Sequence, residues 1–274
     1  MKIRAVAVCC AALALLACEK KDAPADSAPV VTNNAATKNE APATAATTPD
    51  AATKDHVKVT PLEHASLILQ RNGITIAVDP VQQALDAATG DEPKADLILV
   101  TDIHGDHLDP AAIAALRNEG APVVVPKAVA DDAGDALPNP TILNNGESKK
   151  LLEGKVSVEA VPMYNLERKR EDNGEPYHVK GRGNGYVLTL DDQRVYIAGD
   201  TECTPEMRAL EDIDIAFVPM NLPYTMTVEE AGECIKAFKP RTVYPYHSRE
   251  QDPSKLETIL KGTGVEVELL NWYP

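Results

Sequence analysis

Short apolar runs and alternating apolar positions mark the chain from residue 57 onward and predict a strand-rich domain. The expected strands cover residues 57–61, 66–70, 74–78, 96–101, 123–125, 156–161, 186–190, 194–198, 213–220 and 242–246. The Asn72-Gly73 pair is a hairpin turn signal between the second and third of these strands. Residues 96–101 read Asp-Leu-Ile-Leu-Val-Thr, a nearly continuous apolar run that is typical of a buried strand.

Helices are expected to alternate with these strands, and each has a recognisable start. The expected helices begin at about residue 109 and cover residues 205–210, 228–238 and 254–261. Asp109 is an N-cap followed by Pro110 at the first helical position, and Thr204 and Thr227 are the expected caps of two later helices. Strands in both halves that are closed by helices predict an α/β fold with two packed sheets and helices outside.

The first eighteen residues have the pattern of an export signal. Lys2 and Arg4 precede an apolar run over residues 5–17, which is too short to span a bilayer and fits the hydrophobic region of a secretory signal. The run ends in Leu-Leu-Ala before Cys18, which resembles a bacterial lipobox. This resemblance implies cleavage after residue 17 and acylation of the Cys18 thiol. The alternative is an ordinary signal peptide with an incidental cysteine.

The segment after Cys18 is rich in Ala, Thr and Pro and has no apolar period. Such a segment cannot bury enough surface to offset its ordering entropy, so we expect a disordered tether. Glu19 follows the cysteine, and a lipoprotein of this pattern is expected at the outer membrane, facing the periplasm. The expected organisation is a signal peptide over 1–17, an anchored tether over 18–55 and a folded domain over 56–274.

Composition narrows the possible partners of the folded domain. The chain is 44% hydrophobic, which is ordinary for a globular protein, and its 42 acidic against 27 basic residues give a net charge of −15. Binding to a nucleic-acid backbone depends on clusters of Lys and Arg, so a nucleic-acid partner is not expected. The composition leaves the oligomeric state open.

The residues with the clearest chemistry follow the predicted buried strand at 96–101. Residues 101–109 read Thr-Asp-Ile-His-Gly-Asp-His-Leu-Asp, and the potential ligands among them are Asp102, His104, Asp106 and His107. A loop at a strand end can turn several side chains toward one point, and imidazoles with carboxylates suit Zn, Mn or Fe. The alternative is a polar loop that caps a helix through Asp109 and leaves its histidines exposed.

This segment resembles the His-x-His-x-Asp-His signature of the metallo-β-lactamase superfamily, with Asp102 in place of the first histidine. Other elements that resemble the family are His64-Ala65-Ser66, Asp79-Pro80, Gly199-Asp200-Thr201 and Tyr244-Pro245-Tyr246-His247. The string at His64 is similar to the L-ascorbate-6-phosphate lactonase-like branch. The resemblance implies a four-layer αββα sandwich and a metal-dependent hydrolase.

The resemblance also implies one or two divalent transition metals, with Zn expected first and Mn or Fe as alternatives. The implied ligands are Asp106, His107 and His247 for one metal, Asp102 and His104 for the other, and Asp200 as a bridge. Asp106 and His104 are in addition the expected catalytic residues. Metal-bound water is deprotonated near neutral pH, which makes it a nucleophile for hydrolysis.

Two departures from the family pattern affect the second of these metals. Asp102 places a carboxylate where the family has an imidazole, which shifts the preference toward harder ions such as Mn or Fe. A third-motif histidine is expected near the end of the strand at 156–161, where this chain has Asn165. His178, thirteen residues further on, is the expected substitute, unless it is a surface histidine. If neither side chain reaches the metal, the site is mononuclear.

Three further residues are expected beside the metals or the substrate. His64 is either a core histidine with a backbone partner or a group that orients the substrate or a ligand. Asp79 is expected to fix the tautomer of an imidazole ligand, and its alternative is a turn residue before Pro80. Tyr224 is a candidate substrate contact in a segment that follows a buried strand, with packing as the alternative.

Arg182 and the two late cysteines leave alternatives open. Arg182 lies in a Gly-rich string and could either meet an anionic substrate or be a solvated loop residue. Cys203 and Cys234 are the thiols that remain after acylation of Cys18, and they are expected to be two ordinary cysteines or one disulfide rather than ligands.

Together these features predict a lipid-anchored metallohydrolase of the cell envelope that uses a metal-activated water on an ester, lactone or phosphodiester. The substrate would be a small molecule or a lipid headgroup, and the membrane would be reached through the lipid anchor. The alternative is a non-catalytic metal-binding or scaffold lipoprotein that retains the fold with a depleted site.

Overall fold

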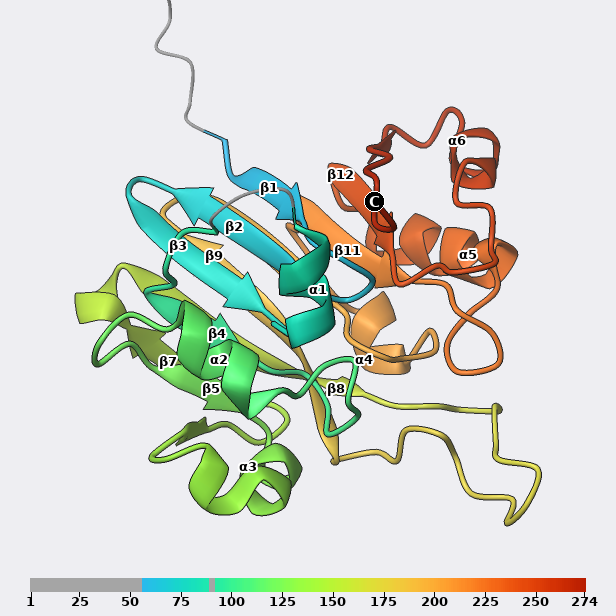
Figure 1. Ribbon diagram of the computed structural model, residues 1–274. Coiled ribbons are helices and arrows are strands. Elements are labelled where there is room, and N and C mark those ends of the chain that lie inside the picture. Colours follow the sequence, from blue (N-terminus) through green and yellow to red (C-terminus); the bar gives the residue numbers. More distant parts are fainter. Residues whose placement is uncertain (1–55, 89–91) are drawn as a thin grey trace, which may run out of the picture. The chain divides into compact units, whose positions relative to one another are not determined.

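The computed structural model describes residues 56–88 and 92–274 (Figure 1). The predicted signal peptide, Cys18 and the tether lie outside the described residues, so the domain boundaries stay predictions. Within the described part of the chain, no helix is both long and apolar enough to cross a membrane.

Two mixed sheets form the centre of the domain. The first contains, in spatial order, β1 (Lys58–Pro61), β2 (Leu67–Arg71), β3 (Ile74–Val78), β4 (Leu97–Leu99), β5 (Val123–Val125) and β6 (Thr141–Ile142). The second contains β7 (Ser148–Leu151), β8 (Val156–Met163), β9 (Gly183–Leu190), β10 (Gln193–Ile197), β11 (Ile215–Pro219), β12 (Thr242–Tyr246) and β13 (Glu266–Val267). Each sheet begins with antiparallel hairpins and continues with parallel strands.

Helices cover the outer face of each sheet (Figure 1). The first sheet carries α1 (Gln82–Ala87), α2 (Pro110–Leu116) and α3 (Lys127–Ala133), and the second carries α4 (Pro205–Arg208), α5 (Val228–Phe238) and α6 (Lys255–Ile259). The expected caps are present: the carboxylate of Asp109 accepts from the first turn of α2, and Thr227 forms a capping box with Glu230 at the start of α5. The predicted four-layer αββα sandwich is confirmed.

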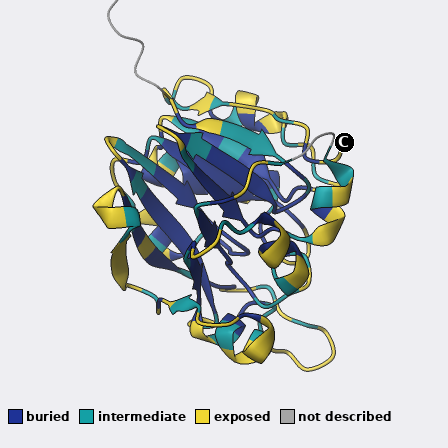
Figure 2. Cartoon of the chain, turned by 60° about the vertical axis from the view of Figure 1, so that its left-hand side comes forward, coloured by how far each residue is buried: buried dark blue, intermediate teal, exposed yellow. Residues whose placement is uncertain are grey.

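Buried apolar side chains fill the space between the sheets and beneath the helices on either side, and Figure 2 shows that the central strands are mostly buried. Alternation along the strands explains this arrangement, because successive side chains point to opposite faces of a sheet. Leu97 and Leu99 of β4 point into the core between the sheets, whereas Ile98 points outward to α2 and α3. On the other side, Ile235 and Phe238 of α5 pack on the outer face of the second sheet.

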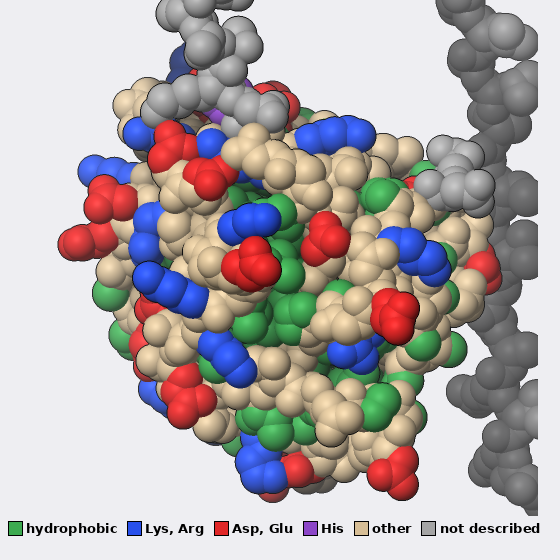
Figure 3. Space-filling view, turned by 90° about the vertical axis from the view of Figure 1, so that its left-hand side faces the viewer, with side chains coloured by type: hydrophobic (Ala, Val, Ile, Leu, Met, Phe, Trp, Pro, Cys, Tyr) green, Lys and Arg blue, Asp and Glu red, His purple; other side chains and the backbone are tan. Residues whose placement is uncertain are grey.

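The acidic excess of the chain is not gathered on the face shown in Figure 3, where acidic and basic side chains are interspersed. The chemistry lies instead at one edge of the sandwich. In open sheets of parallel strands, ligands bind beyond the carboxyl ends of the strands. The loops after β3, β4, β10 and β12 all begin at such ends, and they carry most of the candidate residues.

Candidate metal centre

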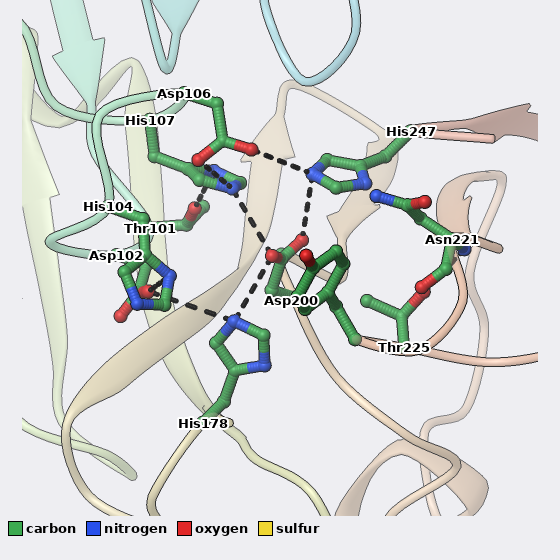
Figure 4. A network of polar contacts seen from close by, with 12 residues as sticks. Thr101, Asp102, His104, Asp106, His107, His178, Asp200, Asn221, Thr225 and His247 are labelled. Atoms are coloured by element: carbon green, nitrogen blue, oxygen red, sulfur yellow. Dashed lines mark hydrogen bonds and ion pairs between the residues drawn. The ribbon is translucent and has the colours of Figure 1, made fainter. Parts of the chain in front are cut away.

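The loop between β4 and α2 brings four candidate ligands to one place. The backbone amides of His107 and Leu108 both donate to the carbonyl of His104 at 2.9 Å, which folds the loop into a tight turn. Asp109 then closes it by capping α2. Both ends are therefore fixed, and the loop presents Asp102, His104, Asp106 and His107 toward the second sheet (Figure 4).

The second sheet supplies three more candidate ligands from separate segments. Asp200 follows β10, His247 follows β12, and His178 comes from the long connection between β8 and β9. The Asp200 carboxylate is the meeting point: its Oδ2 lies 3.4 Å from His107 Nε2 and 3.2 Å from His178 Nε2, and its Oδ1 lies 3.2 Å from His247 Nε2. Burial would raise the pKa of Asp200, but His247 and His107 hold it well below its usual range.

His107 has its second nitrogen fixed, as expected for a metal ligand. Its Nδ1 lies 2.8 Å from Asp79 Oδ2, and Asp79 is itself held by the backbone amide and hydroxyl of Thr101 at 2.7 Å each. Asp79 is fully buried. Burial would lower the pKa of His107, but the charges of Asp200 and Asp79 raise it well above its usual value. The Nε2 atom of His107 is thereby left to face Asp200.

The same arrangement holds His178, and Asn165 is its partner. Asn165 Oδ1 accepts from the backbone amide of His178 at 2.7 Å and lies 2.9 Å from its Nδ1. The Nδ2 of Asn165 donates to the carbonyl of Tyr224 at 2.8 Å. The chain therefore uses both candidates: His178 presents Nε2 to the site, and Asn165, at the expected histidine position, orients it.

Glu202 anchors the segment between Asn165 and His178, although no motif in the sequence points to it. Its buried carboxylate accepts from the backbone amides of Leu166 and Glu167 and pairs with Arg168. Glu202 lies two residues after Asp200. The segment after β10 thus supplies the ligand Asp200 and also, through Glu202, holds the β8–β9 connection that carries His178.

Asp102 differs from the other candidate ligands because a guanidinium contacts it. Arg182 Nε lies 3.1 Å from Asp102 Oδ1 and Arg182 Nη2 lies 3.0 Å from Oδ2, while His104 Nδ1 lies 2.8 Å from the same Oδ2. Burial would raise the pKa of Asp102, but His104 and Arg182 lower it to about 2. Arg182 is therefore not a solvated loop residue, because its guanidinium is paired with a candidate metal ligand.

His64 lies against the same centre from the β1–β2 turn. Its ring lies against that of His247 with centroids 3.6 Å apart and the planes tilted by 35°, and its Nε2 lies 3.4 Å from Asp106 Oδ2. The hydroxyl of Tyr273 lies 2.8 Å from His64 Nδ1 and accepts from the backbone amide of Arg249 at 2.7 Å. Burial lowers the pKa of His64 to about 4, so its imidazole is neutral at pH 7.

Backbone conformation is unusual at three of these positions. His64, Asp79 and His247 have φ of 56°, 44° and 48°, in the left-handed region that residues other than glycine rarely adopt. Gly199, with φ of 65°, precedes Asp200 directly, and a side chain there would collide with Met163. These turns aim the side chains that follow the strand ends into the centre.

The candidate ligands fall into groups whose atoms all lie within 4.8 Å of one another. The groups are Asp102, His104 and His178; His107, Asp200 and His247; and His64, Asp106 and His247. Within the described residues, several buried atoms aimed at the centre lie at ion-pair distance from one another but form no hydrogen bond: His107 Nε2, His247 Nε2 and Asp200 Oδ1. Buried polar atoms are seldom left unpaired, and imidazole nitrogens with carboxylate oxygens fit divalent transition metals.

A cleft of about 900 Å³ opens over these groups. His104, Asp106, His178, Asp200 and His247 lie at its floor. Tyr177 and Tyr224, whose rings meet edge to face with centroids 5.0 Å apart, contribute to its wall. Tyr224 thus lines the cleft as expected, and its side chain is exposed rather than packed in the core.

Comparisons with known proteins agree with this geometry. The family described as "Beta-lactamase superfamily domain" matches residues 58–247. The chain is 32% identical over 227 residues to a UPF0173 metal-dependent hydrolase of Pelotomaculum thermopropionicum, covering 78% of this chain and 97% of the relative. It is 40% identical to a crystal structure assigned as a metal-dependent hydrolase from Parabacteroides distasonis, with a TM-score of 0.72, covering 79% of this chain and 94% of that one.

The chain belongs to the UPF0173 metal-dependent hydrolases of the beta-lactamase superfamily. The structure of Igni18, a metallo hydrolase from Ignicoccus hospitalis, shares the fold with a TM-score of 0.62 at 23% identity, covering 78% of this chain and 94% of that one. Membership makes this protein a metal-dependent hydrolase and confirms the predicted enzyme class. Asp102 and His178 are the positions at which the candidate ligands of this hydrolase differ from the superfamily motif.

The two late cysteines of this hydrolase are bonded to each other. Cys203 and Cys234 form a disulfide with Cα atoms 5.6 Å apart, which joins the loop before α4 to α5. One of the two expected arrangements, the disulfide, is thus present. The sulfur of Cys203 is bonded to that of Cys234, so it is not a metal ligand.

Proposed function

We propose that this metal-dependent hydrolase cleaves an ester, lactone or phosphodiester bond in a small molecule or a lipid headgroup at the bacterial cell envelope. The observation that carries the proposal is the pair of ligand groups joined by Asp200 at the floor of an open cleft. A lactonase-like activity on a cyclic ester is included because His64-Ala65-Ser66 resembles that branch of the superfamily. Zn is the first candidate metal, and Mn or Fe is the alternative.

The chain's own residues define where the chemistry takes place. A bound divalent metal would supply an acidified water and polarise the scissile bond. Asp106, His107, Asp200 and His247 would hold one ion, and Asp102, His104 and His178 the other. Asp106 has 39% of its side chain exposed, whereas Asp200 has 5%, so Asp106 is the carboxylate from which a proton can pass to solvent.

Two guanidiniums on the wall of the cleft support an anionic substrate. Arg170 and Arg249 line the cleft beside Glu171, Asp172 and Glu250, and within the described residues neither arginine forms an ion pair with a carboxylate. Arg249 Nε lies 3.5 Å from His64 Nε2, beside the ligand groups. The neighbouring wall of Leu222 and Tyr224, exposed at 41% and 42%, offers apolar contact to the rest of such a substrate. A phosphodiester with an apolar substituent combines both properties.

The envelope location is supported by the export pattern and Cys18 at the start of the chain. The disulfide between Cys203 and Cys234 is consistent with it, because disulfides persist in oxidising compartments such as the periplasm. Fractionation of cells expressing the full chain and Cys18→Ser tests this point. We expect membrane-associated protein that incorporates labelled fatty acid, and a Cys18→Ser form that does neither. Equal fractionation of the two forms would contradict the anchor.

The activity is tested with purified protein loaded with Zn, Mn or Fe and with three chromogenic substrates: a carboxylic ester, a lactone and an aryl phosphodiester. We expect turnover of at least one substrate, with the phosphodiester fastest, and a loss of that turnover on chelation. Asp131→Ala, on the exposed face of α3, is the matched control for variants of the ligand carboxylates. Protein that holds its metal but turns over none of these substrates would favour the non-catalytic scaffold instead.

A further inference from the structure

The two halves of the metal centre carry different charge. In one group the carboxylates of Asp106 and Asp200 are surrounded by imidazoles. In the other group the fully buried carboxylate of Asp102 faces a guanidinium on both of its oxygens. Arg249, the guanidinium beside the first group, is exposed and contacts His64 rather than a ligand carboxylate. Among the described residues, a largely buried cation thus contacts a ligand carboxylate in only one half of the centre.

Arg182 limits what Asp102 can offer to a metal. The paired hydrogen bonds from Nε and Nη2 use one lone pair on each carboxylate oxygen, and this two-point geometry is the strong form of the contact. His104 Nδ1 lies 2.8 Å from Oδ2 on the other side. Asp102 therefore enters the group with its negative charge balanced by Arg182 and with its oxygens already engaged.

Because the guanidinium of Arg182 is largely shielded from solvent, its charge acts on a second ion with little screening. The Arg182 side chain is 17% exposed, and Coulomb interactions at such sites are screened far less than on the surface. An ion beside Asp102 would be repelled by Arg182 at short range. The ion near Asp106, His107 and His247 meets no such charge in direct contact with its carboxylates.

We propose that Arg182 makes the two metal positions unequal. The position formed by Asp106, His107, Asp200 and His247 fills first, and the position formed by Asp102, His104 and His178 takes its ion at least about tenfold more weakly because of Arg182. The protein therefore carries one resident ion and a second, exchangeable ion whose occupancy follows the free metal concentration. This inference rests on the metal dependence of the family, and it stands or falls independently of the substrate proposed above.

Zinc titration of the full chain freed of metal tests the inference. Calorimetry and competition with a chromogenic chelator give two binding constants, and Co²⁺ absorption bands report each position separately. We expect two resolved steps in the wild type. In Arg182→Gln the second step tightens at least about tenfold, while the first changes by less than about threefold. An equal affinity for both ions in the wild type would overturn the proposal, as would a second step that Arg182→Gln weakens or leaves unchanged.

Two comparison variants separate the buried charge from other effects. Arg182→Lys keeps the cation but loses the two-point hydrogen bond, so its second step should stay close to that of the wild type. Arg170→Gln removes an arginine from the cleft wall that touches no ligand carboxylate, and it should change neither step. If Arg170→Gln tightens the second step as much as Arg182→Gln does, then overall charge, rather than the Arg182–Asp102 contact, sets the affinity for the second ion.

Asp102→Asn covers the case in which Arg182→Gln does not fold. It should abolish the second step and leave the first within about threefold, because its amide nitrogen and neutral oxygen replace a charged ligand. Loss of the first step in Asp102→Asn would reverse the proposed order of filling. Circular dichroism and thermal unfolding in the presence of chelator show that each variant is folded before metal is added.

Discussion

The two sheets contribute to the metal centre in different ways. The first sheet supplies its ligands from the short loop that connects β4 to α2. The second sheet supplies His178, Asp200 and His247 from three separate segments, which meet only in the folded domain. The backbone of the loop is folded by hydrogen bonds within it and by the Asp109 cap, whereas the ligands of the second sheet are brought together only by the fold. Substitutions in the second sheet should therefore act at a distance, and substitutions in the loop should act on one ion.

Asp200→Ala should have the largest effect, because Asp200 alone faces His107, His178 and His247. We expect the loss of both ions and a fall in kcat/KM of at least about 100-fold, since even the partners of metal ligands are worth 10- to 100-fold. Metal content by mass spectrometry of the purified variant checks this. Retention of one full equivalent would mean that Asp200 does not join the two halves.

Asn165→Ala comes next and tests the distance effect. Without its oxygen the His178 ring loses the partner of Nδ1, so the ion at that position should bind about 10- to 100-fold more weakly. Asn118→Ala, whose amide bonds Asp96 at the far edge of the first sheet, is the matched control. An unchanged metal titration together with a lower melting temperature would reduce Asn165 to a structural role.

Tyr273→Phe should have a smaller effect on the same centre. It removes the hydroxyl that contacts His64 and accepts from the amide of Arg249, a loss of two hydrogen bonds of which one touches the centre, and we expect a fall of about 2- to 10-fold in kcat/KM. Tyr244→Phe, on β12, keeps these contacts and should behave as the wild type. If His64 only packs against His247, Tyr273→Phe will lower the melting temperature without changing kcat/KM.

The disulfide should affect stability and leave catalysis intact. Cys203 and Cys234 are 31 residues apart, and closing a loop of that size contributes about 2–4 kcal/mol to the free energy of unfolding. A double serine variant should lose that amount in urea denaturation and keep its kcat/KM at 25 °C. Dithiothreitol should destabilise the wild type alone. A drop in activity would show that the disulfide also positions Asp200.

The contrast between the sheets also explains what the sequence could reveal. The ligands of the β4–α2 loop could be predicted because they lie close together in the sequence, follow an apolar strand and precede the Asp109-Pro110 helix start. The strand alternation likewise predicts the layers. Edge strands β6, β7 and β13 were not predicted. Strands β6 and β13 have two residues each and carry no period, and β7 reads Ser-Lys-Lys-Leu, without apolar alternation. The short helices α1 and α3 lack a capping side chain and were missed for that reason.

The contacts that complete the centre could not be derived from sequence. Arg182 and Asp102 are 80 residues apart, and Tyr273 and His64 are 209 apart, so no local rule connects either pair. His178 could be named only as a candidate, because the segment that carries it has no periodicity from which an orientation follows. Its direction is set by Asn165, and its segment is held by Glu202, both through tertiary contacts.

The left-handed backbone at His64, Asp79 and His247 has a consequence for how this protein can change. Each such residue costs about 1–3 kcal/mol relative to a relaxed conformation, and glycine would remove most of that cost. Screening variants of this protein for thermal stability alone would therefore enrich glycine at these three positions. The variants recovered would melt at higher temperatures and would lack the imidazoles and the carboxylate that the chemistry needs. A selection for greater thermal stability therefore has to select for retained metal binding at the same time.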